Sequence, residues 1–225
     1  DRTPAPLPLA EGETLIYGRV AGVSQGSQWQ ATLTDADAAP TNSGPIDNPP
    51  TPENAAAPAK PTIPEENGAF SYGISLLYAG TMGSGQNQSA EMLVRYPDTA
   101  YQSHGNYGVR YNLTLPLHNP TSEPKTVTVA LQTALKEDEL SEDGLRFLEP
   151  PAQQTFFGGP VRVRYSDDSG LPRVRNIHLV MTRGQQGTPL VEITIAPQST
   201  RTVDVDMLYP ADSTPPQVLT VETQS

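Results

Sequence analysis

The sequence predicts an all-β domain: an antiparallel β-sandwich of immunoglobulin-like or jelly-roll topology, with a long Pro/Ala-rich loop insertion. From residue 69 onward, strand-like runs recur roughly every 10 to 15 residues, a spacing typical of sandwiches and barrels. The 24 prolines and 18 glycines favour many turns. The chain also lacks the crossover helices that a parallel sheet needs. Of the two topologies we favour the immunoglobulin-like one, and the jelly roll is the alternative.

The clearest strand is predicted at residues 107–119, where apolar and polar residues alternate with the period of two that a strand requires. Pro116 interrupts this run and predicts an edge position or a bulge. A Pro/Asn turn at residues 119–124 leads into a second alternating run at 126–132. We therefore expect the two runs to form an antiparallel hairpin.

Further strands are expected on both sides of this pair. A first candidate lies at residues 15–20 and a second at 28–34, around the only tryptophan, Trp29. The later alternating runs lie at residues 161–165, 191–195, 203–207 and 218–221. Their one-sided alternation suits two sheets packed face to face.

The chain divides into a lead and one domain. Residues 1–12 are proline-rich and predict an extended lead, and residues 13–225 predict a single β-sandwich domain. Within that domain, residues 35–67 form a Pro/Ala-rich insertion with almost nothing to bury, which predicts a long loop. No apolar run approaches the ~20 residues of a membrane span, so no transmembrane segment is expected.

Composition excludes several classes of function. The formal net charge of -11 argues against binding of nucleic acid, which requires a surplus of lysine and arginine. The chain has no cysteine, so disulfides, thiolate metal sites and a cysteine nucleophile are excluded.

The sequence contains no motif for catalysis or for binding of a metal or cofactor. His104, His118 and His178 lack the spacing of metal ligands. Gly83-Ser84-Gly85 is too short for a nucleophile elbow, and no lysine of a phosphate loop accompanies it. We therefore expect no catalytic residues, no metal and no cofactor.

Four arginines form the first candidate binding site. Two of them alternate with valines before the turn at residues 166–170, and two follow it. If this segment is a hairpin with Arg164 opposite Arg173, then Arg162 lies opposite Arg175 and all four share one face. Like charges placed opposite one another are unfavourable unless an anion neutralises them, so this face could bind an acidic polysaccharide or an acidic partner protein. The alternatives are that carboxylates of the same chain neutralise the arginines, or that a shifted register separates them.

Four tyrosines form the second candidate site, around the polar loop at residues 104–106. They are Tyr96, Tyr101, Tyr107 and Tyr111. Exposed aromatic rings can stack on sugars, which would make this a carbohydrate-binding loop. The alternative is that these rings fill the corners of the sandwich.

Several longer motifs carry a resemblance to a known family. They are LIYGRVAGV at 15–23, QGSQW at 25–29, MLVRYPDTAY at 92–101, HGNYGV at 104–109, VRVRY at 161–165 and LYPAD at 208–212. Together they resemble the C-terminal half of a cyanobacterial exported protein family catalogued only as a domain of unknown function. The resemblance implies a signal peptide and another β-rich half ahead of this one, and it supplies no catalytic residues.

The sequence favours a non-catalytic secreted or cell-envelope module, either a structural subunit of a surface assembly or an adhesion or binding domain. The expected partners are other envelope or surface proteins, self-association by strand addition through residues 1–12, and acidic polysaccharide. The expected location is the periplasm, the cell surface or the extracellular space. The alternative is a polysaccharide-binding or polysaccharide-active protein, and an active one would need two carboxylates across a cleft.

Overall fold

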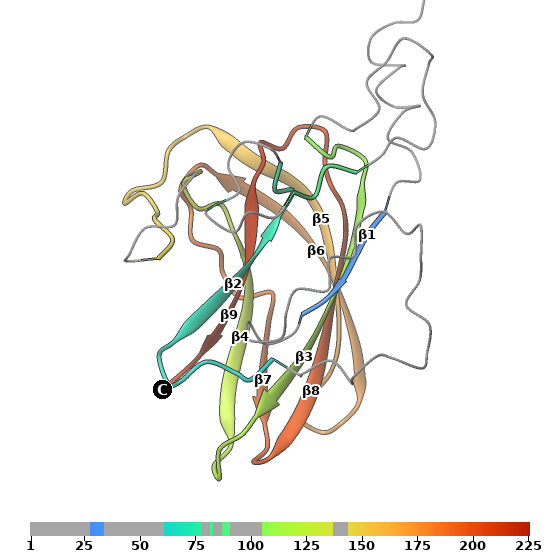
Figure 1. Ribbon diagram of the computed structural model, residues 1–225, viewed down its shortest axis with the longest axis vertical. Coiled ribbons are helices and arrows are strands. Elements are labelled where there is room, and N and C mark those ends of the chain that lie inside the picture. The colour runs from blue at the N-terminus through green and yellow to red at the C-terminus, as the bar shows by residue number, and fades with distance from the viewer. Residues whose placement is uncertain (1–27, 34–60, 78–81, 83–86, 91–104, 137–143) are drawn as a thin grey trace, which may run out of the picture.

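The computed structural model describes residues 28–33, 61–77, 82, 87–90, 105–136 and 144–225. These residues form nine strands and no helix (Figure 1). The strands are β1 (Gln28–Thr32), β2 (Ala69–Ile74), β3 (Arg110–Asn119), β4 (Lys125–Gln132), β5 (Thr155–Ser166), β6 (Pro172–Thr182), β7 (Val191–Ile195), β8 (Ser199–Leu208) and β9 (Gln217–Thr223). The prediction of an all-β chain is confirmed.

The strands form two packed sheets with the topology of a jelly roll. The five-stranded sheet has the order β1-β3-β8-β5-β6, and the four-stranded sheet has the order β2-β9-β4-β7. Without β1, each sheet has four strands, and every strand pair is antiparallel. This is the order of an eight-stranded jelly roll, to which β1 adds a ninth strand beside β3. The jelly-roll alternative is thus confirmed, and our preference for the immunoglobulin-like topology was wrong.

The predicted hairpin between residues 107–119 and 126–132 is also wrong, although both strands exist. β3 lies in the five-stranded sheet and β4 in the four-stranded sheet, so the turn between them crosses the sandwich. The buried Asn119 side chain fixes this crossing, because its Nδ2 donates to the carbonyls of Glu123 and Ile195 at 2.8 and 2.9 Å. Among the described strands, β5 and β6 are the only two that are consecutive in the chain and also paired with each other.

The core lies between the two sheets, as the alternation predicts. On β3 every second side chain is fully buried, from Tyr111 to Leu117. Val203 and Val205 of β8 face the same core. Burial of this kind contributes about 1.5–3 kcal/mol for each large apolar side chain, so it dominates the stability of the fold.

β1 pairs in parallel with β3, and Pro116 lies just beyond the end of that pairing. Leu33 N donates to Thr114 O, and Ile63 N donates to His118 O. The even-numbered residues of β3 therefore turn their backbone groups toward the edge beside which β1 lies. Pro116 lies between them, with the same orientation and no N–H to offer. It is therefore at a local edge, between β1 and the bridge from Thr62 to His118.

The predicted boundary of the insertion is too late by several residues. Ile63 is buried in the core, and the Pro64 carbonyl accepts a hydrogen bond from Thr223 Oγ1 at 2.9 Å. Residues 61–67 therefore belong to the packed domain, because one isoleucine between polar residues is enough to anchor them. The lead at 1–12, the strand candidate at 15–20 and the insertion up to residue 60 lie outside the described residues.

None of the described residues belongs to a helix that is long and apolar enough to cross a membrane.

Candidate functional site

The register of the β5–β6 hairpin separates the four candidate arginines into two pairs. Arg162 lies opposite Asn176 and Arg164 opposite Val174, whereas Arg175 lies opposite Val163 and Arg173 opposite Tyr165. Cross-strand neighbours share a face. Arg162 and Arg164 therefore lie on the outer face of the sheet, and Arg173 and Arg175 on the inner face. The prediction that all four share one face was wrong.

The length of the hairpin loop explains this difference. Asp167 N donates to Leu171 O at 2.8 Å, so the loop contains only residues 168–170. Gly170 closes it with a left-handed φ of 78°, as is typical of three-residue loops. The predicted pairing needs a loop one residue shorter or longer, and a shift of one residue turns every side chain of a strand to the other face.

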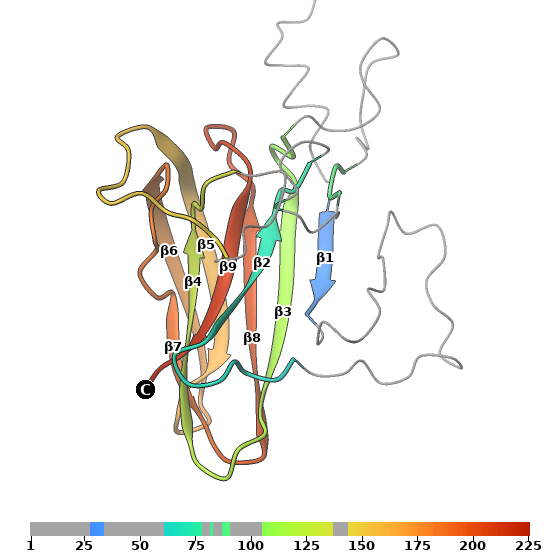
Figure 2. The ribbon, with the colours of Figure 1, turned by 60° about the vertical axis from the view of Figure 1, so that its left-hand side comes forward.

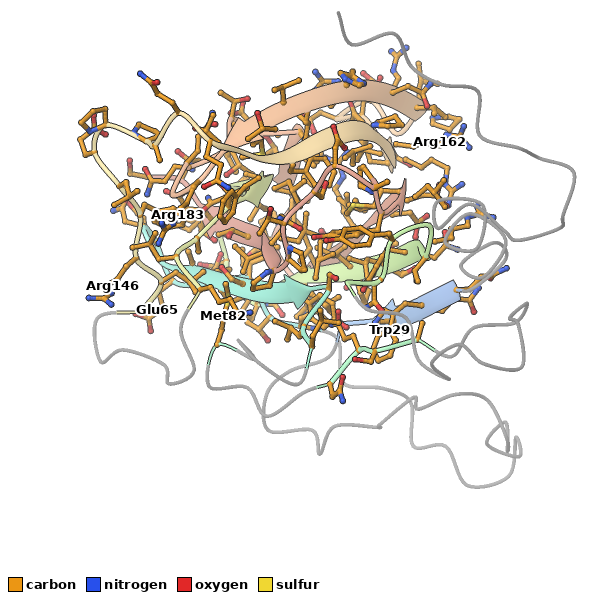
Figure 3. The ribbon with its side chains drawn as sticks, turned by 90° about the horizontal axis from the view of Figure 1, so that it is seen from above. Trp29, Glu65, Met82, Arg146, Arg162 and Arg183 are labelled. Carbon is orange, nitrogen blue, oxygen red and sulfur yellow. The ribbon has the colours of Figure 1, made fainter. Side chains whose placement is uncertain are left out.

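Carboxylates of the same chain lie beside the two outer-face arginines. Arg162 is the cross-strand neighbour of Asp206 in β8, and Arg164 is the neighbour of Asp204. Asp206 also forms an ion pair with Arg110, with 2.7 Å between Asp206 Oδ2 and Arg110 Nη2. Figure 3 shows the Arg162 side chain at the periphery of the domain. The alternative that a shifted register separates the arginines is thus confirmed, and the carboxylates beside the outer-face pair have other partners, Arg110 for Asp206 and Thr114 for Asp204.

The inner-face arginines bind groups at the ends of neighbouring strands. Arg173 Nη2 lies 2.6 Å from Asp167 Oδ2 in the hairpin turn. Hydrogen bonds from the Leu171 backbone and then from Arg173 hold the pKa of Asp167 below its usual value. Arg175 Nη1 donates to the Leu190 carbonyl at 2.6 Å, just before β7. The first contact stays within the hairpin, and the second ties the hairpin to the edge of the four-stranded sheet.

A further ion pair, which the sequence analysis missed, holds the tip of the hairpin. Asp168 Oδ1 lies 2.5 Å from Arg201 Nη1 of β8 and accepts a hydrogen bond from Thr194 N of β7 at 3.1 Å. Arg201 also donates to the carbonyls of Ser166 and Thr194. The bond from Arg201, followed by that from Thr194, lowers the pKa of Asp168. No sequence signal marks this contact, because the residues are 33 positions apart.

Three of the four large apolar residues that are exposed in the described part of the chain lie on the same hairpin. Leu171, Val174 and Val180 are 54%, 59% and 64% exposed, and Leu208 of β8 is 57% exposed. Among the strands that the structure describes, β6 is the last of its sheet, and Figure 2 shows it on the opposite side of the domain from β1. Long edge strands with exposed apolar residues are sites where another chain can add a strand.

The candidate tyrosines divide between buried and undescribed residues. Tyr111 is fully buried, so the expectation that it is an exposed sugar-stacking ring was wrong; it fills the core, as in the alternative interpretation. Tyr107 is half-buried, and its ring stacks on Tyr209 at a centroid distance of 6.1 Å. Tyr96 and Tyr101 lie outside the described residues.

Buried amides surround Tyr111 and satisfy its hydroxyl group. Asn106 Nδ2 donates to Tyr111 Oη and to the Gln88 carbonyl, both at 2.8 Å. Burial raises the pKa of Tyr111 far above its usual value, so the phenol stays neutral. Asn106 has a left-handed φ of 55°, which asparagine tolerates. The polar groups of this cluster hydrogen-bond to one another, so the cluster stabilises the fold and is not a binding site.

Within the described part of the chain, no three or more His, Asp or Glu residues come close enough to hold a metal ion. His118 Nδ1 lies 3.1 Å from Thr200 Oγ1, and His178 is exposed on β6. His104 lies outside the described residues.

One family model matches the chain, over residues 1–50 and 51–223, and its description is Protein of unknown function (DUF3370). The resemblance to a domain of unknown function is thereby confirmed, whereas the cyanobacterial source and the export remain predictions. No curated protein and no solved structure matches the chain.

Proposed function

We propose that this chain, which belongs to the family Protein of unknown function (DUF3370), is a non-catalytic module of the cell envelope or extracellular space that works by binding other proteins. Its role would be that of a structural subunit of a surface assembly or of an adhesion domain. The observation that carries the proposal is the clustering of exposed apolar side chains on the β5–β6 hairpin, at the free edge of a sheet.

Two properties of this edge favour protein contact. Val174 and Val180 both lie on β6, and each leaves more than half of its surface in water. Burying that surface against another protein is favourable by about 25 cal/mol per Å². An unpaired edge adds a row of backbone donors and acceptors for an incoming strand. Elsewhere in the described sandwich, Ser213 Oγ is the one buried side-chain polar atom without a partner.

A polysaccharide-binding role is the second candidate, and one observation favours it. Arg162 and Arg164 are exposed two residues apart on the outer face. A sulfated or uronic chain could bind there if it displaced the neighbouring carboxylates. The carboxylates Asp204 and Asp206 lie beside these arginines and would repel an anionic chain, however, so the protein-binding role has the stronger support.

Two measurements test the proposal. Fractionation of the source cells, followed by detection of the chain, is expected to find it in the envelope or the medium. A screen against neutral and acidic glycans is expected to find no release of reducing ends. Recovery from the cytosol, or reproducible cleavage of any glycan, contradicts the proposal.

The polysaccharide role has its own test. Retention on an acidic-polysaccharide matrix is compared for the unmodified chain, for Arg162→Glu with Arg164→Glu, and for the inner-face control Arg173→Glu. Retention that only the outer-face variant loses would establish the second candidate. We expect no retention of any of the three proteins.

A further inference from the structure

Alternate residues of β6 turn their backbone groups away from the sheet. Asp167 N bonds to Leu171 O at one end of the hairpin, and Arg183 N bonds to Gln154 O at the other. Because hydrogen-bonded and non-hydrogen-bonded pairs alternate in an antiparallel ladder, the odd-numbered residues of β6 bond to β5. The even-numbered residues from 174 to 180 therefore direct their N–H and C=O groups to the free edge. Pro172 has the same outward orientation, so its missing N–H removes no hydrogen bond between β5 and β6.

The side chains on this edge are arranged symmetrically around Ile177. Val174 and Val180 lie three residues on either side of it, and Asn176 and His178 lie one residue on either side. If a second β6 lies antiparallel with Ile177 opposite Ile177, each exposed valine meets the other valine. Each asparagine likewise meets a histidine. All of these pairs join even-numbered residues, so the outward backbone groups of both strands meet in hydrogen-bonded pairs.

Neighbouring registers lack this match. A shift of two residues places Val174 opposite His178, or His178 opposite its own copy. In the register centred on Ile177, the two valines cover the apolar surface that each leaves exposed in the single chain, where the two residues are 59% and 64% exposed. The sequence of β6 is thus complementary to itself in one alignment.

The arginines of β6 also fit this alignment. Arg175 lies opposite Leu179 of the second copy, and Arg173 lies opposite Met181. No arginine of one strand faces an arginine of the other, so the repulsion of opposed like charges is avoided. The aliphatic part of Arg175 can instead cover the half-buried Leu179, whereas Met181 is already buried in the core.

We propose that two copies of this chain associate through β6, antiparallel about a two-fold axis at Ile177, so that the two five-stranded sheets become one continuous sheet. The inference rests on the proposed function, because it names a second copy as the protein that the edge binds. The contact is isologous, since the same strand serves both partners, and it closes at two copies.

A cysteine-free chain allows a direct test of the register by disulfide formation. In the proposed pair, opposing Cα atoms at position 177 are about 4.5 Å apart, within the range of disulfides. Ile177→Cys is expected to form a covalent dimer under mild oxidation. Val174→Cys is the matched control: it lies on the same strand and is more exposed, but in the pair it is roughly 20 Å from its own copy, so it is expected to stay monomeric on reducing-agent-free gels.

A mixture of two variants tests the same register without touching the half-buried Ile177. Val174→Cys and Val180→Cys should each fail to crosslink alone and should crosslink when mixed, because position 174 lies opposite position 180 of the other copy. Crosslinking of Ile177→Cys no faster than of Val174→Cys, with no product from the mixture, overturns the proposal.

Sedimentation velocity on the unmodified chain is expected to show a monomer–dimer equilibrium over micromolar to millimolar concentrations. His178→Pro removes an outward N–H without touching the bonds to β5, and should weaken the dimer on the order of tenfold or more. Leu208→Lys, at an exposed leucine away from β6, should leave the dimer unchanged, and circular dichroism verifies the fold of both variants.

A chain that is monomeric at all of these concentrations overturns the proposal. A monomer found in the envelope without glycan cleavage leaves the proposed function standing, whereas a dimer that cleaves glycans refutes the proposed function alone.

Discussion

β3 and β6 lie in the same sheet and have nearly equal lengths, 10 and 11 residues, but they differ in almost every other respect. In β3 every second side chain is buried, whereas the first five residues of β6 are all exposed. β3 has a neighbour on each side and β6 has one. The difference teaches that the position of a strand in the sheet, more than its strand propensity, sets how much it contributes to stability. Position also sets how much of its surface and how many of its backbone groups stay exposed for binding.

A pair of leucine truncations should give the largest contrast between the two regions. Leu115→Ala removes a fully buried side chain of β3 and should destabilise the domain by about 2–5 kcal/mol, because a cavity remains. Leu171→Ala, at the 54% exposed tip of the β5–β6 hairpin, should change stability by no more than about 0.5 kcal/mol. Chemical denaturation measures both. Equal losses would mean that the hairpin contributes to the core as much as β3 does.

A pair of asparagine truncations extends the contrast to polar groups. Asn106→Ala should cost about 1–3 kcal/mol, because it leaves Tyr111 Oη and the Gln88 carbonyl buried without this donor. Asn176→Ala removes the partner of Arg162 Nε on the exposed edge and should cost less than about 0.5 kcal/mol. Thermal unfolding compares the two variants. A larger loss for Asn176→Ala than for Asn106→Ala would contradict the structural role of the buried amides.

The smallest effect concerns the anchored tip of the hairpin. The folded state lowers the pKa of Asp168 through Arg201, so this contact adds stability above the ordinary pKa of aspartate and loses it as the pH falls through the lowered value. Arg201→Gln should return the pKa of Asp168 toward its ordinary value and flatten the loss of stability below about pH 4. Carboxyl titration by NMR, compared with Arg110→Gln as a control on the outer face, measures the change. An Asp168 pKa that is the same with and without Arg201 would contradict the ion pair.

The alternation of apolar residues was enough to predict most strands and their buried faces. In β3, and in β8 from Val203 to Met207, one face packs against the opposite sheet, so the sequence carries a period of two there. The absence of cysteine likewise excluded disulfides and thiolate metal sites directly. These properties are local, and they do not depend on which strands become neighbours.

Tertiary structure alone decided the partners and the registers. A strand with one buried face fits either sheet, so the alternating runs around residues 119–124 could not show that the chain crosses the sandwich there. The arginine arrangement depended on one residue of loop length, set by the bond from Asp167 to Leu171 and by the left-handed Gly170. Burial of Tyr111, and the contact from Asp168 to Arg201, arise between residues far apart in the chain, where packing and not local sequence selects the partner.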